Sequence, residues 1–232
     1  QAKMAYIPAG SFEMGDHFSE GDDDELPVHR VTLDGFYMDK TEVTVGRFKA
    51  FLADSGYSWD FSWDIVAESS PTDDHPMTYV SWNAAVAYAE WAGKRLPTEA
   101  EWEKAARGGL QGQRYPWGDE IDDTKANYAS NVGTTTVAGS FGANGYGLYD
   151  VAGNVVEWCA DWYAEDYYAS SPATNPQGPE TGTRRVLRGG NWQNPFRSSL
   201  HVANRNTEEP RYDNYGDAGF RCVSEWVTAD SY

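Results

Sequence analysis

The stretch Asn144-Gly-Tyr-Gly-Leu-Tyr-Asp-Val-Ala-Gly-Asn-Val-Val-Glu-Trp158 decides the fold, because it joins glycine-rich turns to two acids at the start of a strand. Its glycines indicate tight backbone that a Cβ would obstruct. Closely spaced oxygen donors can converge here on one cation: the carboxylates of Asp150 and Glu157 and the carbonyls of Gly153 and Val155. Calcium prefers such ligands. The alternative is a glycine-rich turn in which Asp150 caps local N–H groups.

The composition predicts a core of irregular loops clamped by aromatic rings. The chain has 10 Trp, 15 Tyr and 9 Phe alongside 23 Gly, a mixture that long regular helices or sheets would not need. With 232 residues, no internal repeat and no convincing boundary, we expect a single domain over residues 1–232.

The net charge of −18 argues against nucleic acid or an anionic membrane as partner, since both attract cationic surface. No apolar run approaches the roughly 20 residues that span a bilayer, so no membrane insertion is expected. Cys159 and Cys222 fit no zinc or redox spacing. They would form a disulfide in an exported protein and stay buried thiols otherwise, and we expect a secreted or periplasmic protein.

Hydrophobic alternation and turn residues predict the first strands. Residues 4–15 are typical of a short hairpin and residues 27–38 of a strand. Between them, the acidic run 20–25 indicates a solvated loop, with a second metal site as the alternative. Further strands are expected at Val155–Cys159, Arg185–Arg188 and Ala218–Trp226, with an exposed loop at 165–182.

Three helices have recognisable ends. Each begins after a Thr or Ser that can cap it and stops before a glycine. They run from Thr44 to Leu52 before Gly56, from Ser81 to Ala92 before Gly93, and from Thr98 to about Ala106 before Gly108. The last has a capping box, in which Thr98 and Glu101 serve each other's N–H groups.

The chain contains a series of short motifs in a recognisable order. They are Pro8–Gly15, Pro27–Val31, Thr41–Thr44, Pro76–Trp82, Lys94–Glu103, Tyr115–Gly118, Asn144–Trp158, Val186–Gly190 and Gly219–Cys222. This order, from about residue 4 to residue 226, resembles the formylglycine-generating-enzyme family, also called sulfatase-modifying factor. The resemblance implies an α+β fold, a C-type lectin-like variant with short helices around small twisted antiparallel sheets and little regular secondary structure.

The resemblance also implies ligands for calcium. The family's calcium-binding Asn or Asp, two carbonyls and Glu fall on Asp150, Gly153, Val155 and Glu157, which favours a structural calcium site over a capped turn. A second family site would begin at Asn127 and Tyr128, but the segment 129–141 offers no counterpart for its later acidic ligand.

The family's catalytic residues do not carry over. Its enzymes oxidise a cysteine of a sulfatase to formylglycine with copper held by two cysteines shortly after an Arg-Gly-Gly turn. Here Arg188-Gly-Gly190 leads into residues 191–202, which contain no cysteine. Copper is therefore not expected, because copper(I) needs soft thiolates. The iron-dependent relatives use histidines of a further helical domain, which we do not expect here, and the four histidines of this sequence show no ligand spacing.

A ligand groove is expected in segment 184–221, which carries a local charge of +3 and many aromatic and Asn residues. The candidate groove residues are Asn191, Trp192, Phe196, His201, Arg205 and Tyr212. The alternative is that the segment's arginines satisfy buried loop carbonyls, a role we expect for Arg188, Arg205 and Arg221.

Three functions remain open on this sequence. The first is a calcium-stabilised module that binds a peptide or small molecule, or acts as an accessory domain, without formylglycine-generating activity. The second is a metal-dependent oxidoreductase of the same superfamily with another metal or cofactor. The third is a diversified ligand receptor on the C-type lectin fold. The fold alone does not decide between these functions.

Overall fold

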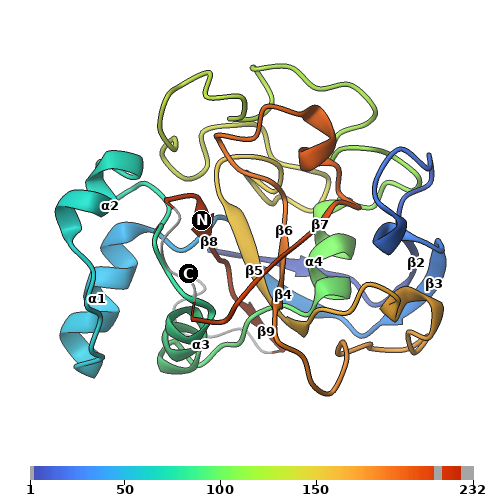
Figure 1. The fold of residues 1–232 in the computed structure, drawn as a ribbon, viewed down its shortest axis with the longest axis horizontal. Helices are drawn as coiled ribbons and strands as arrows, with labels where there is room; N and C mark the ends of the chain where they lie inside the picture. The colour runs from blue at the N-terminus through green and yellow to red at the C-terminus, as the bar shows by residue number, and fades with distance from the viewer. Residues whose placement is uncertain (1–2, 212–215, 226–232) are drawn as a thin grey trace.

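Strand β5 (Val156–Trp162) lies at the centre of the fold. The computed structural model describes residues 3–211 and 216–225. In it, β5 pairs antiparallel with β6 (Arg185–Arg188) and parallel with the short β8 (Ala218–Gly219), while β7 (Arg205–Glu208) pairs with β6. The resulting order β7-β6-β5-β8 brings the glycine-rich stretch beside the C-terminal segment (Figure 1).

Two smaller sheets flank this one. β4 (Phe36–Asp39) pairs with both β1 (Met4–Ile7) and β9 (Val223–Ser224), whereas β2 (Gly10–Met14) pairs with β3 (His29–Leu33). All of these pairs are antiparallel. The short helices and small sheets confirm the predicted α+β fold class.

The helices are short and capped by side chains. They are α1 (Val45–Ser55), α2 (Trp63–Ser69), α3 (Trp82–Trp91) and α4 (Glu99–Ala106), with 3₁₀ turns η1 (Asp23–Glu25), η2 (Tyr167–Ala169) and η3 (Arg197–Leu200). Thr44, Ser81 and Thr98 accept the expected N-terminal N–H groups, and α4 has the predicted capping box. In Figure 1, α1, α2 and α3 gather on one side of the central sheet and β2 and β3 on the other.

The two faces of β5 contact different hydrophobic clusters. Val156 and Trp158 pack with residues of α1 and α3, while Cys159 packs on the opposite face with β1–β4 and α4. This alternation follows the two-residue repeat of a strand. Cys222 belongs to the same cluster as Val156 and Trp158, and both cysteines are buried free thiols.

Three strand predictions are wrong, one in its pairing and two in their extent. Residues 4–15 form no hairpin, because β1 joins β4 and β2 joins β3 in separate sheets. The expected strand at 27–38 is broken at Asp34-Gly35 into β3 and β4. The expected final strand is likewise divided into β8 and β9, which lie in different sheets; its last residue, Trp226, lies outside the described ranges.

Two elements escaped the sequence patterns altogether. Helix α2 spans only seven residues, and β7 carries the polar sequence Arg-Asn-Thr-Glu. Neither has the periodicity on which such predictions rest. Within the described ranges, no helix has both the length and the apolar character needed to cross a bilayer.

Asp161→Asn should flatten the pH dependence of stability. Asp161 accepts the Glu99 N–H at 2.8 Å, and burial followed by the charge of Glu99 raises its pKa from 3.8 to about 8. The folded protein therefore keeps a proton that the unfolded chain releases. Between about pH 4 and pH 8 the unfolding free energy of the wild type should fall by up to about 1.4 kcal/mol per pH unit more than that of the variant.

Urea denaturation of both proteins across this pH range measures the difference. An Asn oxygen still accepts the Glu99 N–H, so the helix cap is kept. Equal pH slopes for wild type and variant would contradict the protonated state of Asp161.

Candidate functional site

The glycine-rich stretch turns sharply just before β5. Asp150 and Asn154 adopt left-handed backbone, with φ of 55° and 63°. Gly153 lies at φ 81°, and a Cβ there would come within 2.4 Å of the Asn127 carbonyl oxygen. Left-handed conformations at non-glycine residues cost free energy and cluster at binding sites. Asp and Asn are the non-glycine residues that adopt this conformation most readily, so turn preferences account for both positions.

Glu157 lies on the β5 face that contacts α4, and its carboxylate is saturated. Arg221 donates from Nε to both oxygens at 3.0 and 2.8 Å and from Nη2 to Oε1 at 2.7 Å. Trp102 donates from Nε1 to Oε2 at 2.9 Å. A carboxylate has about four acceptor positions, and these donors occupy them. Glu157 would reach a cation only by giving up one of these donors.

Asp150 has the opposite environment. Its Oδ2 accepts the Gly139 N–H at 2.5 Å, but its buried Oδ1 has no hydrogen-bond partner among the described residues. Burial raises the pKa of Asp150 to about 6, against the hydrogen bond from Gly139. A buried carboxylate oxygen without a partner is costly, and a cation is one group that removes the cost.

Glu42 is a second acid at this site, which sequence reasoning missed. It is fully buried, its Oε1 accepts from Asn154 Nδ2 at 2.9 Å, and its Oε2 has no partner within the described part of the chain. Burial and then the charge of Asp150 raise the pKa of Glu42 well above its usual range. The acid stands in the Thr41–Thr44 motif, where only the helix cap was interpreted.

Asn127 joins the same hydrogen-bond network. Its Nδ2 donates to Asn154 Oδ1 at 3.3 Å and to the Thr134 carbonyl at 2.8 Å. Its Oδ1 is buried, and no described residue donates to it. The carbonyl of the neighbouring Tyr128 accepts the Asn131 N–H at 3.0 Å. Asn154 thus links Glu42 to Asn127, and the open oxygens of this network are all hard donors that suit calcium.

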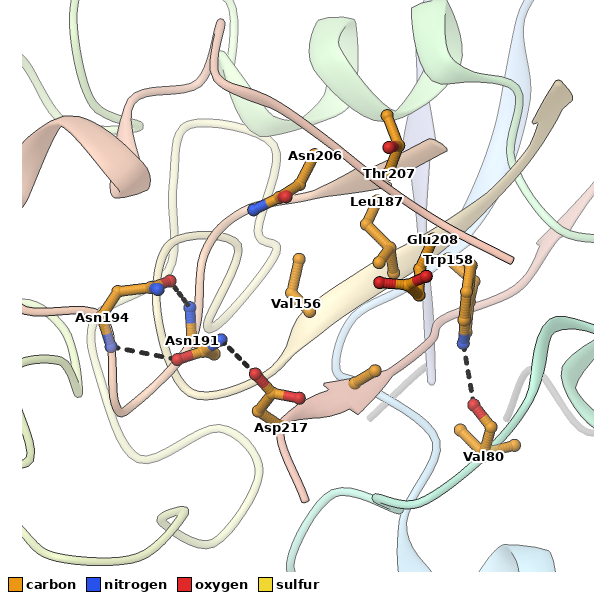
Figure 2. A pocket seen from close by; sticks show the side chains of 11 residues that line it. Val80, Val156, Trp158, Leu187, Asn191, Asn194, Asn206, Thr207, Glu208 and Asp217 are labelled. Atoms are coloured by element: carbon orange, nitrogen blue, oxygen red, sulfur yellow. Dashed lines mark hydrogen bonds between the residues drawn. The ribbon is translucent and has the colours of Figure 1, made fainter. Parts of the chain in front are cut away.

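A cavity of about 250 Å³ opens beside β5 and β6 (Figure 2). Its apolar lining comes from Val80, Val156, Trp158, Leu187 and Ala218, and its polar lining from Asn191, Asn194, Asn206, Thr207, Glu208 and Asp217. Asn191 donates from Nδ2 to Asp217 Oδ2 at 2.6 Å, and Asn191 and Asn194 bond each other through backbone and side chain. The lining holds two acids and no base, so the cavity carries negative charge.

Of the five predicted groove residues that the structure describes, Asn191 alone lines this cavity. Trp192 is buried, and its Nε1 donates to the Gly216 carbonyl at 3.3 Å. Phe196 is 70% exposed on the loop before η3. His201 is buried edge-on against Tyr115, and burial lowers its pKa. Of the remaining two, Arg205 is buried against Glu99, and Tyr212 lies outside the described residues.

The cavity residues that sequence reasoning missed come mainly from β7 and from the turn before β8. They are Asn194, Asn206, Thr207, Glu208 and Asp217. Glu208 and Asp217 were visible only as acids in a segment of positive net charge. Burial raises the pKa of Asp217 to about 6, so it ionises in the neutral range. Finding these residues required the pairing of β7 with β6, which no local pattern predicts.

The donor set does not fit the family's copper. The chain has only two cysteines, and neither lines the cavity. Both lie in the core, where burial raises the pKa of the Cys159 and Cys222 thiols well above the usual range. Copper(I) binds thiolates, and carboxylates and amides do not replace them.

These features define an α+β domain with a loop network of open oxygen donors and an acidic cavity. The chain matches the sulfatase-modifying factor enzyme 1-like domain over residues 1–226. It therefore belongs to the formylglycine-generating-enzyme family, as the motif order predicts.

Known relatives differ in what they do. The chain is 39% identical to the formylglycine-generating enzyme of Streptomyces coelicolor, over 94% of this chain and 88% of that protein. It is 42% identical to the serine/threonine-protein kinase pkn1 of Chlamydia pneumoniae, over 95% of this chain but only 38% of that longer protein. The structure of PvdO from Pseudomonas aeruginosa superposes with a TM-score of 0.82 at 31% identity, covering 96% of this chain and 94% of PvdO.

Proposed function

We propose that this domain is a calcium-stabilised binding or accessory module that does not oxidise cysteine to formylglycine. One observation carries the proposal: the cavity beside β5 presents carboxylates and amides where a copper centre would need thiolates. The similarity to part of a kinase-named protein supports an accessory role, since there the matching region is one portion of a longer chain.

The ligand we propose is a peptide side chain or small molecule with a positive charge and an apolar body. Glu208 and Asp217 supply negative charge, and Val156, Trp158 and Leu187 supply an apolar wall. The cavity of about 250 Å³ lies just under the roughly 300–1,000 Å³ of pockets for drug-sized ligands. It therefore suits one extended group rather than a large cofactor.

Calcium would bind at the glycine-rich turn and tie loops together. Asp150 and the Gly153 and Val155 carbonyls are the proposed ligands, with Glu42 as a second carboxylate. Glu157, bound by Arg221 and Trp102, would join only by exchanging a donor. Binding energy at such a site adds to folding stability because the unfolded chain has no preformed site.

An oxidoreductase is the second candidate, favoured by the similarity to a formylglycine-generating enzyme and to PvdO. An oxygen-consumption assay with a cysteine peptide, run separately with copper(I) and with iron(II), separates the two. We expect no oxygen uptake and no loss of the peptide thiol, because no thiolate lies in the cavity. The Streptomyces coelicolor enzyme serves as positive control, and turnover above the metal-only background would refute the proposal.

Calcium should raise the melting temperature, and a chelator should reverse the rise. At a free concentration about 100 times the Kd, binding adds about 2.7 kcal/mol, or roughly 5–10 °C for a domain of this size. Asp150→Asn should remove the part of this shift that comes from the glycine-rich turn, measured by calorimetry. Asp161→Asn, another buried aspartate outside the network, should keep it. An equal shift in all three proteins would exclude Asp150 as a ligand.

Hexylammonium should bind the cavity more tightly than hexanol of the same length. The charge of Glu208 favours the cation, and Asp217 adds to it above about pH 6 as it ionises. Glu208→Gln should weaken hexylammonium binding by about tenfold, the loss expected for one charged hydrogen bond. Glu209→Gln, one residue beyond the cavity lining, is the matched control. Calorimetry that shows equal affinity for both probes would contradict a cationic ligand.

A further inference from the structure

The acidic loop before β3 gathers three carboxylates at one point. Asp22 caps the 3₁₀ turn η1, and Asp24 and Glu25 lie within that turn. One carboxylate oxygen from each of these residues lies within 4.8 Å of those from the other two. Asp22 is exposed, whereas Asp24 is 7% exposed and Glu25 fully buried. An acidic loop that only faces solvent would not bury two of its acids.

Each of the two buried acids has one oxygen without a partner. Tyr163 donates its hydroxyl to Asp24 Oδ2 at 2.7 Å, and Asn204 donates from Nδ2 to Glu25 Oε1 at 3.2 Å. Asp24 Oδ1 and Glu25 Oε2 are buried and accept no hydrogen bond from any described residue. Buried charged oxygens left open in this way destabilise a fold unless another group binds them.

The surroundings favour a cation as that group. An open cavity of about 490 Å³ reaches the loop and is lined by four acids: Asp22, Asp23, Asp24 and Glu165. Among the described residues its lining has one base, Arg205, whose Nε and Nη2 are held by Glu99 at 2.8 and 3.1 Å and whose Nη1 lies 3.9 Å from Asp24 Oδ2. The positive charge of Arg205 is thus shared between Glu99 and Asp24, and the other three acids leave the cavity with excess negative charge and an entry path from solvent.

We propose that Asp22, Asp24 and Glu25 bind a hard divalent cation, for which calcium is the best match. Carboxylate oxygens on a loop that opens to water allow the irregular coordination that calcium accepts, while magnesium demands near-ideal octahedral geometry. Water from the open cavity completes the shell. This site shares no residue with the network around Asp150, so each can bind without the other.

A proton is the competing occupant of the same oxygens. Burial raises the pKa of Glu25 to about 7, so without an ion the carboxyl group is partly protonated near neutrality. Asp22 distinguishes the two occupants. A proton on Glu25 needs nothing from this exposed side chain, whereas a cation uses its carboxylate directly.

Calorimetric titration with calcium in the Asp150→Asn background tests this site alone. We expect one remaining site, and Asp22→Asn added to that background should weaken it by at least about tenfold. Asp23→Asn removes the same charge from the same loop but leaves the three proposed ligands unchanged. It should change the affinity less than about threefold. Terbium should bind competitively with calcium and show luminescence sensitised by the adjacent Tyr163.

Two outcomes would overturn the proposal. One is an absence of calcium binding in the Asp150→Asn protein at millimolar calcium, with circular dichroism showing that it is folded. The other is an equal loss in Asp22→Asn and Asp23→Asn, which would indicate general attraction by the acidic loop. If the site at Asp22, Asp24 and Glu25 binds no calcium, the proposed site at Asp150 is not affected. That site is tested separately, by the shift in melting temperature that Asp150→Asn removes.

Discussion

The fold depends on buried glutamates of helix α4 that bind arginines, two of which lie far away in sequence. Glu103 binds Arg107 and Arg188, while Glu99 binds Arg205. Burial alone would raise the pKa of Glu103, but Arg107 and Arg188 together lower it below its usual value. Removing one partner of such a buried pair costs about 3–5 kcal/mol, because the other charge is left uncompensated. A helix of eight residues, too short to persist alone, thereby fixes β6 and β7.

The same arginines explain why the cavity contains no base. Arg188 also donates to the carbonyls of residues 202–204, Arg205 to the Asp24 carbonyl, and Arg221 to those of Lys40 and Tyr149. The prediction that these three residues satisfy buried loop carbonyls is confirmed. Three of the seven arginines of segment 184–221 are therefore buried inside the fold, and the charged and polar residues that line the cavity are acids, amides and one threonine. Local net charge in sequence does not give the charge of the surface that a segment exposes.

Sequence patterns predicted what is local and missed what is not. The caps at Thr44, Ser81 and Thr98 need only the next few residues, so those helices were placed correctly. Strand partners depend on residues far along the chain, and β1 paired with β4 instead of the adjacent β2. The spacing of the glycine-rich stretch identified acids that are buried, but not which of them has a carboxylate oxygen without a hydrogen-bond partner. Glu157 is occupied by Arg221, 64 residues away, whereas Asp150 keeps an open oxygen.

Open acceptors mark where this fold lacks regular backbone pairing. Within the described ranges, every buried side-chain oxygen without a partner lies outside the strands and helices, or in the 3₁₀ turn η1. Glu157 on β5 and Glu103 on α4 pair with arginines, because rigid neighbours hold both groups in place. Carboxylates on the loops have no such fixed partner, and a mobile ion can occupy what a tethered side chain does not reach. On a chain of net charge −18, bound cations are the natural complement to the arginines. Such cations would neutralise the buried carboxylates on the loops, as the arginines neutralise Glu157 and Glu103.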